Sequence, residues 1–162
     1  MEYSLKLNGK QDPLWLKRLI ESKNFEVNYM NRQHNALFIH EFDLSGGLKI
    51  TVYDNNFPAD HPAASYETMF QEEDFIYQQT ISFELENNQQ YELWYKTMYE
   101  ISFSVIGSLK VDGVFYHTSG EEIFFFKNGK YTFNGTYLEL LQTHYGELLE
   151  NIEYSVFMKS LN

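Results

Sequence analysis

Residues 101–133 read ISFSVIGSLKVDGVFYHTSGEEIFFFKNGKYTF. Three turn-forming dipeptides divide this stretch, namely Asp112-Gly113, Ser119-Gly120 and Asn128-Gly129. Short apolar runs separated by such pairs are typical of consecutive strands joined by tight turns. The stretch therefore predicts a β-meander of three or four strands that begins near Met98. A meander of this kind has to bury one of its faces against another layer of the protein.

Working outward, the N-terminal part of the chain predicts a strand, a helix and three further strands. Apolar and polar residues alternate over 2–7, which indicates a strand. Asp12 followed by Pro13 is a typical helix start, with Asp12 as the N-cap, and predicts a helix over 13–23. The next alternating segments predict a hairpin over 25–43, with its turn at 31–35, and a strand over 48–52.

The middle of the chain begins with a loop over 54–65, which holds two of the three prolines. Ser65 is a possible cap for a short helix that ends at Phe70. Residues 75–85 return to the strand pattern. Asn87-Asn88 then indicates a tight turn, followed by an alternating strand over 91–95.

The C-terminal part changes to a helical period. Residues 136–139 fit a capping box. The apolar residues that follow recur every three or four positions, at Leu138, Leu141, Tyr145, Leu148 and Ile152. We expect a helix to about Asn151, followed by a terminal strand or turn. The prediction is one α+β domain over 1–162, with a mainly antiparallel β-meander sheet and an N-terminal and a C-terminal helix packed on it.

The charge balance is strongly acidic. The chain has 12 Lys and Arg against 23 Asp and Glu, which gives a formal net charge of −11. This balance argues against binding to nucleic acid or to anionic membrane surfaces, both of which select basic surfaces. If the chain has a macromolecular partner, we expect a basic protein. A solvated acidic surface without a partner is the competing interpretation.

Several other features bound the class of protein. The chain has no cysteine, which excludes disulfides and cysteine-ligated zinc. The N-terminus does not resemble a signal peptide, and no apolar run is long enough to span a bilayer. We therefore expect a cytoplasmic protein. The oligomeric state is left open by the sequence.

No catalytic or metal-binding motif is present. The sequence lacks a nucleophile elbow, a phosphate-binding glycine loop and an HExxH motif. His40, Glu41 and Asp43 are close in sequence, but on a strand His40 points away from the other two. We expect a protein that is not an enzyme and that needs no cofactor and no metal.

The aromatic residues allow two interpretations. Six apolar residues are candidates either for the lining of a ligand pocket or for the packed core: Phe103, Val105, Phe115, Phe124, Phe126 and Phe133. The run of phenylalanines over 124–126 places at least one ring on each face of a strand. Either one ring is exposed at an interface, or the sheet is covered on both faces.

Acidic and aromatic residues together suit a protein-binding surface, because charge steers the encounter and aromatic rings supply the buried contact. The candidate partner-binding residues are Glu72, Glu73, Asp74, Glu121, Glu122, Phe125, Glu147 and Glu150. Of these, Glu147 and Glu150 are expected to share one face of the C-terminal helix.

A small, acidic, cysteine-free α+β chain rich in Tyr, Phe and Asn resembles bacterial immunity proteins, which bind and neutralise toxins. The resemblance covers the general character of the whole chain and assigns no residue a role. It implies a non-enzymatic inhibitor that blocks a basic toxin domain. Two alternatives remain, which are a domain that binds a small apolar ligand and a structural or assembly accessory protein.

Overall fold

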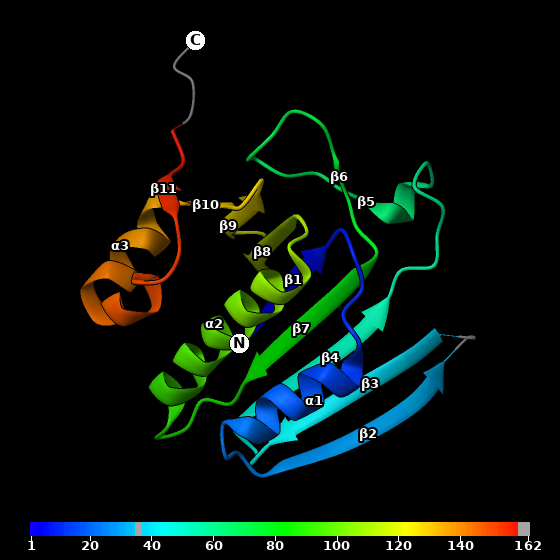
Figure 1. Cartoon of the computed structure of the whole chain (residues 1–162), viewed down its shortest axis with the longest axis vertical. Coiled ribbons are helices and arrows are strands. Elements are labelled where there is room, and N and C mark those ends of the chain that lie inside the picture. The colour runs from blue at the N-terminus through cyan, green and yellow to red at the C-terminus, as the bar shows by residue number, and fades with distance from the viewer. Residues whose placement is uncertain (35–36, 159–162) are drawn as a thin grey trace.

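The structure is a computed structural model that describes residues 1–34 and 37–158. Its main element is a nine-stranded sheet (Figure 1). In spatial order the strands are β11 (Tyr154–Val156), β10 (Lys130–Phe133), β9 (Glu122–Lys127), β8 (Gly113–His117), β1 (Glu2–Leu7), β7 (Gln79–Leu85), β4 (Leu48–Asp54), β3 (Leu37–Leu44) and β2 (Val27–His34). All neighbouring pairs are antiparallel except β10 and β11, which are parallel.

The α-helices cover one face of this sheet (Figure 1). The helical segments are α1 (Pro13–Ser22), α2 (Tyr91–Leu109), α3 (Gly135–His144) and the short 3-10 helices η1 (Pro62–Ala64) and η2 (Gly146–Leu149). Two further strands, β5 (Ser65–Tyr66) and β6 (Phe75–Ile76), form a small separate sheet. The predicted α+β class, with N-terminal and C-terminal helices on a mainly antiparallel sheet, is confirmed.

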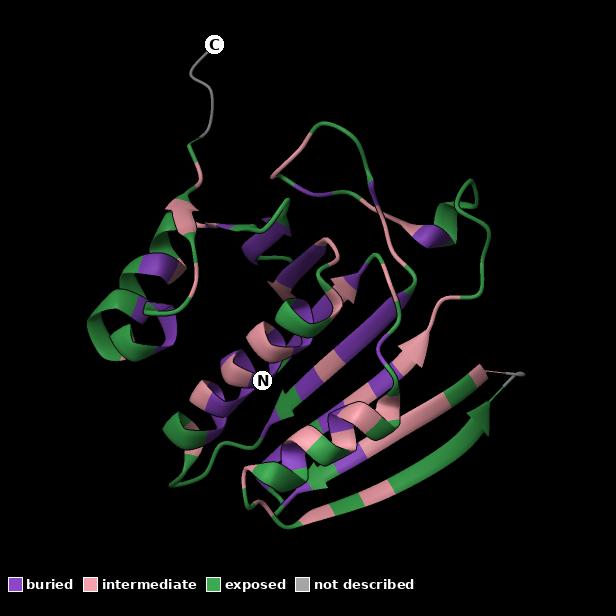
Figure 2. Cartoon of the chain, in the orientation of Figure 1, coloured by how far each residue is buried: buried purple, intermediate pink, exposed green. Residues whose placement is uncertain are grey.

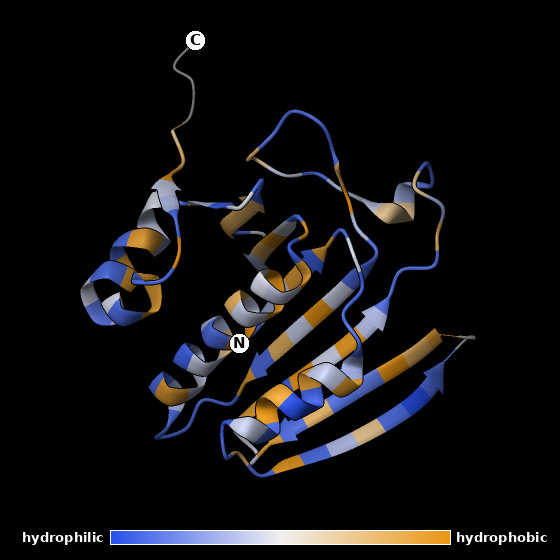
Figure 3. Ribbon diagram, viewed as in Figure 1, coloured by the Kyte–Doolittle hydropathy of each residue, from blue (hydrophilic) through white to orange (hydrophobic). Residues whose placement is uncertain are grey.

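The first strand joins the two halves of the sheet. β1 lies between β7 and β8, so Leu5 is paired with Ile81 on one side and with Phe115 on the other. Leu5 and Leu7 are fully buried beneath the helices. β7 shows the same alternation of hydrophobic and hydrophilic residues, which is visible along its ribbon in Figure 3. The N-terminal strand is therefore a central element of the sheet.

The largest correction concerns residues 91–109. They were predicted as strands, but they form the helix α2, and Asn88 lies just before it instead of in a hairpin turn. Trp94, Met98, Ile101 and Val105 are all buried, and their spacing of three and four residues is helical. Figure 2 shows the buried side of α2 facing the sheet. The predicted meander is therefore limited to β8, β9 and β10.

Within that shorter meander the turn prediction is confirmed. Asn128 and Gly129 both have positive φ angles, of 53° and 81°, between β9 and β10. Two consecutive residues with positive φ match the two-residue hairpin turn that an Asn-Gly pair favours. Gly120 also has a positive φ, of 103°, between β8 and β9.

The predicted start of α1 is confirmed, whereas the turn of the first hairpin differs from the prediction. Asp12 caps α1 as expected, with its Oδ1 accepting a hydrogen bond from the Leu14 amide at 2.9 Å. The 25–43 hairpin is formed by β2 and β3. The predicted turn is partly wrong because β2 continues to His34, and Asn35 lies outside the described residues.

Three further segments also differ. Ser65 begins the strand β5 instead of a helix. The 75–85 segment divides into β6 and β7. The C-terminal helix α3 is capped by Asn134, which accepts a hydrogen bond from the Thr136 amide at 3.3 Å, and ends at His144 instead of Asn151.

The structure decides between the two interpretations of the phenylalanine run over 124–126, an exposed ring or a sheet covered on both faces. Phe124 and Phe126 belong to the main core beneath the helices, whereas Phe125 points to the opposite face. There Phe125 belongs to a second, smaller cluster with Phe75 and Val114. This face is covered by residues 55–78, which connect β4 to β7 and which we call the excursion. The sheet is thus covered on both faces at this point.

Candidate functional site

Six of the eight predicted partner-binding residues are exposed, and they lie in different parts of the fold. Glu72, Glu73 and Asp74 are in the loop between β5 and β6. Glu121, the residue before β9, reaches the C-terminal helices, where its Oε2 accepts a hydrogen bond from the Tyr137 hydroxyl at 2.6 Å. The acidic loop and the C-terminal helices are separate regions (Figure 1). The structure therefore divides the predicted site into two acidic regions.

Glu147 and Glu150 do not share a face of a long helix, because α3 has already ended. Glu147 lies in η2, and Glu150 is the residue that follows it. Glu147 forms an ion pair with Lys96 of α2, with Nζ and Oε1 2.7 Å apart. The hydrogen bond from Lys96 lowers the pKa of the Glu147 carboxyl. Both glutamates are exposed, so they remain available to a partner.

Glu122 is buried and bonds to other parts of the chain instead of facing solvent. Its side chain is buried, and its carboxylate accepts hydrogen bonds from the Thr68 hydroxyl and from the Met69 amide, the latter at 2.8 Å. Both donors belong to the 55–78 excursion. The carboxylate thus attaches the excursion to β9, and Glu122 is not part of an accessible surface in this chain.

Phe125 is also withdrawn from the surface, with 5% of its area exposed. Its ring is stacked with Phe70 at a centroid distance of 5.8 Å and meets Phe75 edge-on at 5.8 Å. The excursion supplies both partners. The ring is therefore buried within the chain instead of being exposed for an interface.

The predicted pocket residues likewise form packed core. Phe115 and Phe124 are fully buried and stacked at 5.1 Å, and Tyr99 of α2 meets Phe115 at 5.5 Å. Rings at these separations fill the space between α2 and the sheet. The structure therefore supports the interpretation that the six candidate residues form the packed core and not the lining of a ligand pocket.

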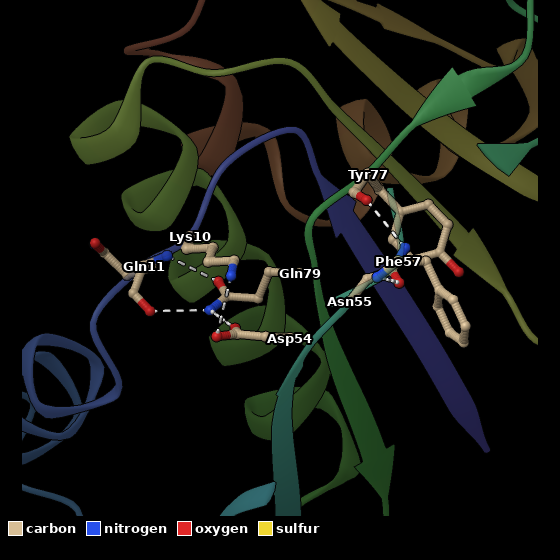
Figure 4. A network of polar contacts seen from close by, with 7 residues as sticks. All are labelled: Lys10, Gln11, Asp54, Asn55, Phe57, Tyr77 and Gln79. Atoms are coloured by element: carbon tan, nitrogen blue, oxygen red, sulfur yellow. Dashed lines mark hydrogen bonds and ion pairs between the residues drawn. The ribbon is translucent and has the colours of Figure 1, made fainter. Parts of the chain in front are cut away.

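A concavity of about 570 Å³ lies elsewhere, next to the excursion. It is lined by His34, Leu37, Tyr53, Asp54, Asn55, Asn56, Phe57, Ala63 and Tyr77. Side-chain amides hold the backbone around it (Figure 4). Asn55 Nδ2 donates to the Tyr77 carbonyl at 3.1 Å, and Asn55 Oδ1 accepts from the Phe57 amide at 3.1 Å. Its walls are mostly apolar and aromatic, with few polar groups, as is typical of small-molecule sites.

The buried Gln79 fixes the other end of the excursion (Figure 4). Its Nε2 donates to the Gln11 carbonyl and to Asp54 Oδ1, both at 3.0 Å, and its Oε1 accepts from the Gln11 amide at 2.9 Å. Lys10 lies 3.8 Å from the same aspartate. One buried amide thus ties β7 to the segment before α1.

A second concavity, of about 360 Å³, lies between β1, the start of α2 and the C-terminal helix. We call it the tyrosine groove. It is lined by Tyr3, Tyr91, Glu92, Tyr95, Tyr137, Leu140, His144 and Tyr145. Tyr91 and Tyr95 are stacked at 6.1 Å, and Tyr145 is tilted against Tyr95 at 5.5 Å.

Several tyrosines of this groove have a raised pKa. Burial raises the pKa of Tyr95 to about 12. Burial also raises the pKa of Tyr137, and the nearby Glu121 adds to this effect. For Tyr145, burial and then the negative charge of Glu92 raise the pKa. The raised pKa values keep the hydroxyls of Tyr95, Tyr137 and Tyr145 protonated at neutral pH.

The sequence did not reveal the tyrosine groove. Tyr91 and Tyr95 are four residues apart, which is the spacing of neighbours on one helix face. Assigning this segment to a strand concealed the pairing. Tyr137 and Tyr145 come from a distant segment, and no local pattern connects them with α2.

Within residues 1–34 and 37–158, no group of three or more His, Asp and Glu side chains is arranged to hold a metal ion. Among the same residues, no helix combines the length and the apolar character needed to cross a membrane.

Comparison with known proteins identifies a family. The model of the SitI3-like family matches residues 1–139, which extend from β1 into α3. Neither a curated protein nor a solved structure matches the chain. Because the family model covers most of the sequence, the chain belongs to the SitI3-like family, a family of immunity-like proteins.

Proposed function

We propose that this protein is an immunity-type inhibitor that binds a basic toxin domain and neutralises it without turnover. The observation that carries the proposal is the family match over residues 1–139. An inhibitor of this class acts by occupying a surface of its partner, so it needs neither a cofactor nor a catalytic group of its own.

The charge of the chain supports a basic partner. The net charge is −11, and the two acidic regions are both exposed. Opposite net charges raise the rate at which two proteins meet, and this steering weakens as ionic strength increases. An inhibitor that must act before a toxin reaches its target benefits from fast association.

The test is affinity capture from the native cell at low salt, with mass spectrometry of the bound proteins. We expect one basic protein to be recovered, with an association rate that falls at least several-fold between roughly 50 and 500 mM salt. Recovery of no basic protein at low salt contradicts the proposal.

Charge reversal distinguishes the two acidic regions. Glu72→Lys with Glu73→Lys changes the loop, and Glu147→Lys with Glu150→Lys changes the C-terminal region. The matched control is Glu26→Lys with Glu86→Lys, because both side chains are exposed and the net charge changes equally. At least one of the first two variants should weaken capture more than the control. Affinity unchanged from the wild type in both acidic-region variants removes the acidic-surface mechanism.

The 570 Å³ concavity favours a second candidate, a domain that binds a small apolar ligand. Tyr53, Phe57 and Tyr77 give it aromatic walls. Native mass spectrometry of the protein purified without denaturant tests this alternative. A retained apolar molecule that is lost from a Tyr53→Ala variant supports it, and an unliganded mass contradicts it.

A further inference from the structure

The tyrosine groove combines aromatic faces from three separate parts of the chain. Tyr3 comes from β1, Tyr91 and Tyr95 from the first two turns of α2, and Tyr145 is the residue that follows α3. Tyr3 meets Tyr95 edge-on at 6.0 Å, so the rings form a continuous wall. Its volume of about 360 Å³ is at the lower end of the range for ligand sites, which suits one side chain better than a large molecule.

Two carboxylates lie at the groove, which His144 also lines. Glu92 is exposed and lines it directly, and Glu121 is hydrogen bonded to the lining residue Tyr137. None of the lining residues is a lysine or an arginine. Two cations near the groove are already engaged: Lys96 is paired with Glu147 at 2.7 Å, and the ammonium of Met1 donates to the Leu85 carbonyl at 3.3 Å. The groove is therefore an aromatic site with an acidic rim.

The chemistry of such a site selects a cation. The face of a tyrosine ring attracts a positive charge, and the attraction is strongest where water is partly excluded. A guanidinium group is planar, stacks on aromatic faces, and carries five donors for hydroxyl and carboxylate oxygens. A lysine ammonium is a more strongly hydrated point charge and gains less from stacking.

We propose that the tyrosine groove accepts an arginine side chain presented by the protein partner. Its guanidinium stacks on Tyr91 or Tyr145 and donates hydrogen bonds to the Glu92 carboxylate. This inference rests on the proposed function, because the arginine belongs to the partner. It adds a defined contact to an association that net charge alone would leave unspecific.

The test uses N-acetyl-L-arginine amide as the probe and N-acetyl-L-citrulline amide as its neutral counterpart. Each is titrated into the full chain, and the ring signals of the 13 tyrosines are followed by NMR. We expect saturable shifts for Tyr91, Tyr95 and Tyr145, with a dissociation constant on the order of 1–10 mM for the arginine probe. The citrulline probe should bind roughly tenfold more weakly or not at all.

Variants connect the shifts with the groove. Glu92→Gln should weaken binding of the arginine probe about threefold or more, because it removes the facing charge. Tyr91→Leu should have a similar effect, because it removes a stacking face. Glu139→Gln is the matched control, since Glu139 is an exposed residue of α3 that does not line the groove. Near-UV circular dichroism checks that each variant is folded.

Two results overturn the inference. One is equal binding of the arginine and citrulline probes, and the other is an arginine affinity that Glu92→Gln and Tyr91→Leu leave unchanged. The titration needs no partner, so its outcome is separate from that of affinity capture. Capture of a basic protein without probe binding overturns only the arginine site. Probe binding without capture overturns the toxin-binding proposal, and with it the partner as the source of the arginine, but supports a cation preference of the groove.

Discussion

The two faces of the sheet are covered in different ways. On one face, α1, α2 and α3 enclose the main core, in which Tyr99, Phe115 and Phe124 are fully buried. On the other face, the 55–78 excursion covers a cluster of only three buried residues, Phe75, Val114 and Phe125. The helices, which we call the first cover, are held on the sheet by apolar packing. The excursion, which we call the second cover, is held at its ends and in its middle by hydrogen bonds of polar side chains.

This difference indicates where the protein opens first. A segment with few buried apolar contacts and with short secondary structure has a low local free energy of unfolding. The excursion contains η1, β5 and β6, each of two or three residues. It also contains the exposed loop with Glu72 and Glu73. One of the two proposed acidic contact regions is thus carried by the less stable cover, and the other is next to the main core.

The largest expected effect is in the main core. Phe124→Ala should lower the free energy of unfolding by about 3–5 kcal/mol, because the ring is fully buried against Phe103, Phe115 and Tyr131. Urea unfolding followed by circular dichroism measures the change. Phe57→Ala is the control, since 53% of that side chain is exposed, and should change stability by less than about 0.5 kcal/mol. A similar loss in both variants would contradict the assignment of the core.

The second cluster should tolerate the same change better. Phe125→Ala is expected to cost about 2 kcal/mol, below the usual range for a buried phenylalanine, because the excursion can settle into the space. Hydrogen exchange should show faster opening of residues 65–76 and unchanged protection of α2. A loss equal to that of Phe124→Ala would show that the two covers are equally rigid.

The same contrast explains how far sequence analysis could reach. β1 was predictable from the alternation of apolar and polar residues over 2–7. The β9–β10 hairpin was predictable from its Asn128-Gly129 turn. The helix α2 was not, because its buried residues extend around most of its circumference, including Trp94, Tyr95 and Met98. Because so many residues of this segment are apolar, two periods fit it equally well. Tyr91, Leu93 and Tyr95 alternate as in a strand, and the apolar residues also recur every three or four positions as in a helix.

The candidate site was less accessible than the fold. The exposed acidic residues could be named from composition, but Glu122 could not be separated from Glu121 in advance. The two neighbours point to opposite sides, and only the three-dimensional position of Thr68 makes one of them an anchor. The tyrosine groove required contacts between segments about 40 to more than 130 residues apart in the chain, which a single sequence does not encode as a local pattern.

Ionisation of Tyr95 provides a further test of the main core. Burial raises the pKa of Tyr95 to about 12, whereas an unfolded tyrosine has a pKa of about 10. The folded state keeps a proton that the unfolded state releases, so the stabilisation is complete below pH 10 and is lost as the pH rises toward 12. By pH 11 the loss should be about 1.4 kcal/mol for this residue.

Thermal unfolding of the wild type and of Tyr95→Phe between pH 8 and 11 measures this effect. The variant loses the hydrogen bond between the Tyr95 and Tyr99 hydroxyls, which are 3.1 Å apart, so its stability at pH 8 should be lower. Its further decrease on going to pH 11 should be smaller than that of the wild type. An equal decrease in both proteins would assign the alkaline sensitivity to other buried tyrosines.

The smallest expected effect concerns the anchor of the second cover. Glu122→Gln keeps the size of the side chain but removes the charge that strengthens the hydrogen bonds from Thr68 and from the Met69 amide. The cost should be about 1 kcal/mol, which corresponds to roughly fivefold faster hydrogen exchange at Met69. Glu121→Gln is the matched control, because that carboxylate bonds Tyr137 on the other side of the strand. If Met69 exchanges equally fast in both variants, the carboxylate of Glu122 does not hold the middle of the excursion, and the aromatic contacts hold it there instead.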